Sequence, residues 1–246
     1  MIYRLTLCYN DYVYTREVFM INGGYIERNY KNLLAEIDRA SGGRNIQLVA
    51  VTKSGSDEEL IALASLGVTD IAENRPQELR RRCDLLAAAG FSPRMHQIGN
   101  LQKSNVKHIV KDVAMIHSVD SFSLAEKISR LAVECGRVIP VLVEVNSAKE
   151  EQKGGVLPEE AEELTAALKS LPGISLCGIM TMGPRVADSE ELRPYFRETR
   201  ELFDRLSALG RFDGEPILSM GMSASFLVAI EEGATLVRVG TRLFEK

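Results

Sequence analysis

Short apolar runs alternate with amphipathic stretches along most of the chain. The apolar positions of residues 26–37 follow a helical period, which ends at the stop signal Ser41-Gly42-Gly43. The pattern then predicts strands near residues 47–53, 68–72, 94–99, 113–118, 139–145, 174–180, 216–219 and 235–239. It predicts helices near residues 56–66, 75–89, 102–111, 121–136, 158–170, 189–209 and 223–232.

This alternation predicts an α/β fold with a parallel sheet, because each return to the sheet needs a crossover. Apolar runs such as residues 139–143 are typical of strands covered on both faces. Eight units in about 200 residues match a single (β/α)8 TIM-type barrel with an extra N-terminal helix. The alternative is an open doubly wound sheet, which usually carries a glycine-rich turn after its first strand. Residues 53–56 contain only one glycine, which favours the barrel.

Composition narrows the protein class. A 246-residue chain with 45% hydrophobic residues can fill one core, which we assign to residues 25–246. The net charge of -4 argues against nucleic acid as a partner, and the apolar runs are too short for a membrane helix. Four scattered cysteines and three histidines lack disulfide or metal-ligand spacing. We therefore expect a cytoplasmic protein without a metal site, and nothing demands more than a monomer.

The first 24 residues differ from the rest. Residues 1–20 hold four of the seven tyrosines, and no small-residue cleavage site follows them. Our hypothesis is that residues 1–24 are an atypical, dispensable extension and that Met20 is a natural start.

Lys53 ends the first predicted strand and is the first candidate for chemistry. It shares one strand face with Val51, while Arg238 and Gly240 share a face of the last strand. Barrel closure makes these two strands neighbours, and barrels bind ligands at the C-terminal strand ends. A buried lysine loses its proton readily and becomes a nucleophile toward carbonyl groups. The alternative is that Lys53 extends from the barrel rim into water.

Two turns near the C-terminus suit a phosphate group. Ser219 leads into a turn where Gly221 allows close backbone approach and Ser223 is placed to cap the next helix. Gly240 and Thr241 end the last strand similarly. The alternative is ordinary turn chemistry with an N-cap serine. Because both turns follow the strands beside which barrels commonly bind phosphate, the phosphate site is favoured.

Other polar residues are expected near the same strand ends. Arg238 lies in an apolar strand and needs a partner, either a ligand or an ion pair with Glu144. Asn74 and Gln77 predict a capping-box-like helix start, and a cap at the barrel mouth can also touch a ligand. We expect His96 to be a hydrogen-bonded barrel histidine rather than a base.

Taken together, these segments resemble the pyridoxal 5′-phosphate (PLP) homeostasis protein family. The resemblance covers about residues 25–244 and rests on the stretches 48–53, 73–78, 96–102, 116–121, 145–146, 153–154, 178–184, 218–223 and 232–241. It implies a single barrel like the N-terminal domain of alanine racemase, without that enzyme's second domain.

The resemblance also implies roles for individual residues. Lys53 matches the family lysine that holds PLP as a Schiff base, and Arg238 matches the arginine beside the pyridine nitrogen. The charge of that arginine disfavours ring protonation and so weakens the electron sink. Asn74 and Met220 match ring-side positions. The phosphate region comprises Ser219, Gly221, Ser223, Gly240 and Thr241.

The implied function is intracellular PLP homeostasis and amino-acid and keto-acid balance, with little or no catalysis and no assigned catalytic residue. PLP-dependent apoenzymes are candidate partners. The alternatives are a PLP-dependent racemase or aldolase, which needs an opposing acid–base group, and a Schiff-base aldolase without a cofactor. Departures from the family pattern leave the affinity for PLP open; they are Ala72, Arg75, Pro76, Ser225 and Arg242.

Overall fold

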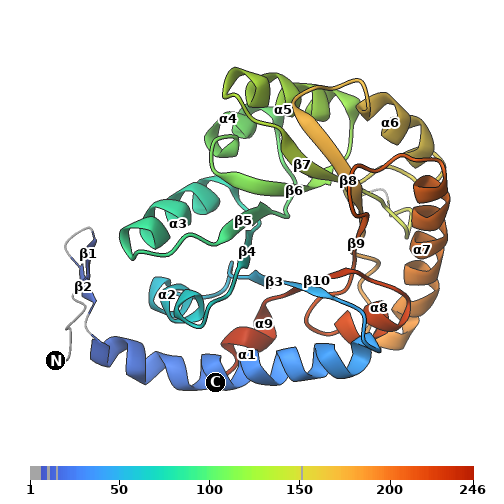
Figure 1. Ribbon diagram of the computed structural model, residues 1–246. Coiled ribbons are helices and arrows are strands. Elements are labelled where there is room, and N and C mark those ends of the chain that lie inside the picture. The colour runs from blue at the N-terminus through green and yellow to red at the C-terminus, as the bar shows by residue number, and fades with distance from the viewer. Residues whose placement is uncertain (1–6, 10–11, 15, 151) are drawn as a thin grey trace.

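Eight parallel strands close a barrel (Figure 1) in a computed structural model that describes residues 7–9, 12–14, 16–150 and 152–246. The strand order around the barrel is β10-β3-β4-β5-β6-β7-β8-β9, which confirms the predicted (β/α)8 class. The strands are β3 (Gln47–Val51), β4 (Asp70–Glu73), β5 (Arg94–Gln97), β6 (Val113–Val119), β7 (Ile139–Glu144), β8 (Ile174–Met180), β9 (Ile217–Ser219) and β10 (Leu236–Val239).

Helices surround the barrel and connect successive strands (Figure 1). They are α2 (Asp57–Ser65), α3 (Pro76–Ala88), α4 (Val106–Ile109) after the 3-10 turn η1 (Lys103–Asn105), α5 (Phe122–Glu134), α6 (Ala161–Leu168), α7 (Arg193–Ala208) after η2 (Ser189–Leu192), α8 (Phe226–Glu231) and α9 (Thr241–Phe244). Several predicted bounds need correction, among them the helix predicted from residue 158, which begins at Ala161. The first barrel strand ends at Val51 rather than at residue 53, and the helix predicted from residue 223 begins at Phe226.

The N-terminal helix is longer than its apolar period predicts. Helix α1 (Arg16–Ser41) packs against α2, α8 and α9, with Ile26, Leu33 and Ile37 buried on one face. The predicted boundary at residue 24 therefore lies inside a helix. Before α1, β1 (Leu7–Tyr9) and β2 (Tyr12–Tyr14) pair as an antiparallel hairpin. Residues 1–6, 10–11 and 15 of the predicted extension lie outside the described residues.

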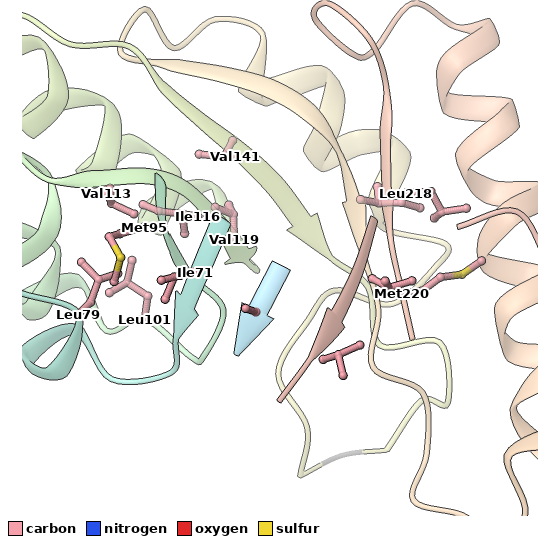
Figure 2. Close-up of a cluster of buried hydrophobic side chains, with 14 of the residues drawn as sticks. Ile71, Leu79, Met95, Leu101, Val113, Ile116, Val119, Val141, Leu218 and Met220 are labelled. Carbon is pink, nitrogen blue, oxygen red and sulfur yellow. The ribbon is translucent and has the colours of Figure 1, made fainter. Parts of the chain in front are cut away.

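Strand side chains alternate between two apolar regions, as expected for strands covered on both faces. The larger region joins strands to helices: Figure 2 shows Met95 of β5 beside Leu79 of α3. Two smaller clusters of strand residues, one with Val49 and Val51 and one with Leu142 and Met180, lie in the barrel interior. Because Val49 pairs with Arg238, this face carries both predicted site strands to the same barrel mouth.

Candidate functional site

A cavity of about 390 Å³ opens at the C-terminal ends of the barrel strands. Its volume lies within the roughly 300–1,000 Å³ typical of ligand sites. It gathers six of the nine predicted site residues, namely Lys53, Asn74, Ser223, Arg238, Gly240 and Thr241. Its other lining residues are Val51, Ser54, Ile98, Gly99, Asn100, Glu144, Gly154, Met182, Met222 and Ala224.

The other three predicted residues lie behind the cavity lining. The Ser219 side chain is fully buried, and Met220 belongs to the buried apolar cluster between barrel and helices (Figure 2). Gly221 has a φ of 89°, and an added Cβ would lie 2.5 Å from the Cβ of Ala229. Helix packing therefore explains this glycine without a ligand. Contact of these three residues with a cofactor stays a prediction.

Lys53 is presented on a turn just after β3. Its side chain is exposed and lines the cavity, so the expectation of a buried lysine is wrong. The turn is held from behind by Arg82 of α3, whose Nη1 donates to the carbonyl of Thr52 at 2.5 Å and whose Nη2 donates to that of Gly55 at 2.8 Å. The nucleophile candidate thus combines solvent access with a fixed backbone.

Arg82 and Glu73 form a buried ion pair beneath this turn. Arg82 Nη1 lies 2.6 Å from Glu73 Oε1, and the two side chains are 6% and 1% exposed. Glu73 also accepts a hydrogen bond from the Thr52 hydroxyl at 2.5 Å. Arg82 is not among the site residues predicted from the sequence. Its signal is a charged residue three positions after Leu79, on the apolar stripe of α3.

Arg238 lies on β10, next to the strand that leads to Lys53, and is 3% exposed. Its Nη1 donates to Ser219 Oγ at 2.5 Å, and its Nη2 donates to the Thr181 carbonyl at 3.0 Å. Burial lowers the pKa of Arg238 to about 10, although the attraction of Glu144 opposes this shift. Among the described residues, no carboxylate forms an ion pair with Arg238. The ion pair with Glu144 that we considered as an alternative is therefore not formed.

Glu144 ends β7 and contributes the one carboxylate among the described residues that line the cavity. The side chain is 6% exposed. Burial raises the pKa of Glu144 to about 7, with Arg238 opposing the shift and Asp120 adding to it. A carboxyl group with this pKa exchanges its proton near neutral pH, so the cavity contains a weak acid as well as two cations.

Two turns close the remaining side of the cavity. The Ser223 hydroxyl accepts a hydrogen bond from the backbone N–H of Gly240 at 3.1 Å, which ties both predicted phosphate turns together. Ser223 does not cap α8 as predicted, because the N-cap position is Ser225. Ser225 Oγ accepts instead from the N–H of Met222 at 3.2 Å, within the same turn.

Asn74 lines the cavity next to the Lys53 side, just after β4. It does not cap α3, because the N-cap position is Arg75 and no side chain caps that helix. The Gln77 amide donates to Asn105 instead. Gly99 packs against the Asn74 backbone so tightly that an added Cβ would lie 2.2 Å from the Asn74 carbonyl oxygen. Close backbone packing thus fixes Asn74 at the barrel mouth.

Arg242 does not line the cavity. Its guanidinium pairs with both carboxylate oxygens of Glu36 on α1, at 2.9 and 2.6 Å. Arg242, which departs from the family pattern, therefore binds helix α1 rather than the cavity. Within the described part of the chain, no cluster of three or more metal-ligating side chains occurs. No helix there is long and apolar enough to cross a membrane.

Comparison with known proteins supports the resemblance seen in the sequence. The family model described as "Alanine racemase, N-terminal domain" matches residues 21–245. A pyridoxal phosphate homeostasis protein from Aquifex aeolicus is 39% identical over 220 residues, which cover 89% of this chain and 95% of that relative. The chain belongs to the pyridoxal phosphate homeostasis protein family.

Solved structures place this family member among known barrels. The structure of PipY from Synechococcus elongatus PCC7942 with PLP bound has a TM-score of 0.79 and 28% identity, covering 89% of this chain and all of PipY (100%). An alanine racemase from Clostridium difficile 630 has a TM-score of 0.73 at 21% identity. This chain covers 60% of that racemase, and the likeness shows the shared fold alone.

Proposed function

We propose that this protein binds pyridoxal 5′-phosphate reversibly and covalently through Lys53, and acts in PLP homeostasis with little or no catalysis. The observation that carries this proposal is one cavity in which the exposed Lys53 amine and the buried Arg238 guanidinium face a common space. The two tied turns at Ser223 and Gly240 complete that cavity. PipY with PLP bound is similar over its whole length, which supports the same ligand here.

The lining residues fit the chemical groups of this cofactor. When bound, PLP supplies an aldehyde that condenses with amines and a ring that withdraws electrons. The Lys53 amine is free to reach the aldehyde, while the turns at Ser223 and Gly240–Thr241 are the proposed phosphate holders. Asn74 and Arg238 would bind the ring side. The charge on Arg238 disfavours protonation of the ring nitrogen, so the residues favour retention over carbanion chemistry.

An absorption titration with PLP tests this proposal. Wild-type protein should develop a visible band on adding PLP, and borohydride should fix the cofactor on Lys53, as peptide mass spectrometry can locate. Lys53→Ala should show neither result. Lys107→Ala, at an exposed lysine of α4, is the matched control and should behave as the wild type. A band that persists in Lys53→Ala, or no band in the wild type, would overturn the proposal.

A second candidate is a PLP-dependent racemase or aldolase, and Glu144 is the observation that favours it. A racemase needs a proton-exchanging group opposite its lysine, and Glu144 combines a cavity position with a pKa of about 7. Incubation with single enantiomers of alanine, serine and threonine tests this candidate. Stereoinversion or cleavage that Glu144→Gln abolishes would establish it, whereas unchanged amino acids would leave homeostasis as the function.

We also propose that the barrel alone carries this function, as a monomer in the cytoplasm that serves PLP-dependent apoenzymes. The family match from residue 21 supports a dispensable N-terminal segment. A chain that begins at Met20 should fold and bind PLP with unchanged affinity. Loss of folding or binding in that shortened chain would show that residues 1–19 are needed. Sedimentation at equilibrium measures the oligomeric state.

A further inference from the structure

A chain of buried polar side chains runs from Arg238 through the barrel interior. Arg238 contacts Ser219, and Ser219 Oγ lies 3.2 Å from His117 Nδ1. His117 Nε2 lies 2.9 Å from His96 Nδ1, and His96 Nε2 lies 2.9 Å from Asp70 Oδ1. All five side chains are at most 3% exposed. The prediction that His96 is hydrogen-bonded is confirmed, because both of its ring nitrogens have partners.

When both imidazole rings are neutral, the two ends of this chain fix the direction of its hydrogen bonds. A guanidinium can only donate, so Ser219 accepts from Arg238. Asp70 accepts at the other end: burial would raise the pKa of Asp70, but hydrogen bonds from His96, Arg94 and Thr69 lower it to about 2. A carboxylate has no proton to give, so His96 donates to it.

The two histidine tautomers follow from these ends. A neutral His96 that donates from Nε2 offers only a lone pair at Nδ1, so His117 must donate to it from Nε2. Burial holds the pKa of His117 well below its usual range, which keeps that ring neutral and leaves its Nδ1 as an acceptor. The Ser219 hydroxyl then donates to His117 and keeps its lone pairs for Arg238.

Few other charged groups reach this chain within the described residues. Arg94 Nη2 binds the second oxygen of Asp70 at 2.7 Å, and its side chain is 63% exposed. Tyr30 of α1 lies close enough to Asp70 for the carboxylate to contribute to raising the pKa of Tyr30, after burial. Glu144 attracts Arg238 across the cavity. Of the three outside groups, only Arg94 contacts the chain directly, and it does so at the Asp70 oxygen that His96 does not use.

We propose that His96 and His117 are positioning residues of the ligand site, which relay a one-way series of hydrogen bonds from Arg238 to Asp70. The relay keeps Ser219 as an acceptor and so fixes the Arg238 guanidinium at the cavity wall. Asp70, at the start of β4, thereby controls a residue at the opposite end of the barrel interior. The effect on PLP rests on the proposed function, whereas the tautomers do not.

Nitrogen-15 NMR of the histidine rings in ligand-free protein tests the relay directly. The chain has three histidines, and the exposed His108 serves as an internal reference outside the relay. His96 and His117 should both be neutral with the proton on Nε2 at pH 7. A proton on Nδ1 of either ring, or a doubly protonated His96, would overturn the proposed direction.

Paired Ser219 variants test the middle of the relay. Ser219→Ala removes the hydroxyl that donates to His117, so His117 should change to a mixture of tautomers. Ser219→Thr keeps the hydroxyl and should retain the Nε2–H form. Identical histidine spectra for Ser219→Ala and wild type would show that Ser219 does not fix the tautomer, and the relay would be wrong.

Variants of Asp70 and Arg94 test whether the relay affects PLP binding. Asp70→Asn lets an amide donate to His96, so His96 should lose its fixed tautomer and PLP should bind on the order of 5-fold more weakly. Arg94→Gln removes the exposed cation but leaves the contact between Asp70 and His96, and should change neither readout. Unchanged tautomers and PLP affinity in Asp70→Asn would overturn the relay. Correct wild-type tautomers without any PLP binding would instead refute the proposed function alone.

Discussion

Lys53 and Arg238 line the same cavity, but the fold holds their side chains differently. The Lys53 side chain is exposed, and only its backbone turn is fixed, by the Arg82 guanidinium behind it. Arg238 is fixed at the guanidinium itself, through Ser219 and Thr181, and is 3% exposed. One cation therefore has an exposed side chain on a fixed backbone turn, whereas the other is buried and hydrogen-bonded at its guanidinium.

The difference matches the chemistry available to each group. A lysine amine must lose its proton and approach a carbonyl carbon, which requires access and freedom to move. An arginine stays charged and acts through a fixed field, so burial with satisfied donors suits it. Variants of the residues that support or neighbour the two cations test this comparison.

The largest effect is expected from Arg82, the support of the Lys53 turn. Arg82→Met leaves Glu73 buried without its partner and should lower the free energy of unfolding by about 3–5 kcal/mol. Arg82→Lys retains a charge and should lose less. Urea unfolding measures both. The control is Arg81→Met, whose pair with Asp57 is 39% and 28% exposed and should cost no more than about 1 kcal/mol. Equal losses for the two methionine variants would contradict the buried support.

A smaller effect is expected from Glu144, which faces Arg238 across the cavity. Its pKa rises from 4.5 to about 7 on folding, so the folded state favours the neutral acid. The stability that Glu144 contributes is therefore present below pH 4.5 and is lost as the pH rises through 7. Over this window wild type should lose up to about 3 kcal/mol relative to Glu144→Gln.

Unfolding measured at pH 5 and pH 8.5 for both proteins checks this sign. A difference between wild type and Glu144→Gln that does not change with pH would mean that Glu144 is not held neutral by the fold.

The spacing between the two cations depends on Gly240. An added Cβ at this position would lie 2.8 Å from the Val51 carbonyl oxygen, where the last strand meets the first. Gly240→Ala should therefore cost about 1–3 kcal/mol and should weaken PLP binding, because the Lys53 and Arg238 sides move apart. Thermal unfolding and a PLP titration measure the two effects. The control is Gly24→Ala in α1, where an added Cβ meets nothing within 4 Å and should stabilise the helix slightly.

The smallest effect is expected from Arg242, a third cation nearby that lies outside the cavity lining. Its pair with Glu36 is partly exposed, at 35% and 22%, so Arg242→Ala should cost less than about 1 kcal/mol. PLP affinity should stay at the wild-type value. A marked loss of PLP affinity in Arg242→Ala would show that a third cation contributes to the ligand site.

The sequence predicted the barrel because its signals are local. Apolar strand runs and helix periods recur in order, and closure then places Lys53 near Arg238 without further information. The errors occur where local rules compete. Ser223 and Ser225 are both good capping residues, and the contact of Ser223 with Gly240, distant in sequence, decided which one precedes α8.

The supporting residues of the site were less predictable, because they depend on tertiary contacts. The sequence could show Arg82 only as a charge on an apolar helix stripe, with no sign that it binds the Thr52 carbonyl. His96 was expected to be hydrogen-bonded, but its partner His117 lies on another strand. The Met220 side chain is buried in the apolar core, which its position beside the phosphate turn did not indicate.

The pairing of β3 with β10 has a consequence for how the protein is made and lost. Lys53 is synthesised well before Arg238, so a ribosome-bound chain lacks the complete cavity until β10 has emerged. A ligand that contacts both Lys53 and Arg238 bridges the seam between β3 and β10. Its binding energy opposes opening of the barrel at that seam. Cellular turnover of the protein would then follow the supply of its ligand, because ligand-bound molecules open this seam to proteases less often.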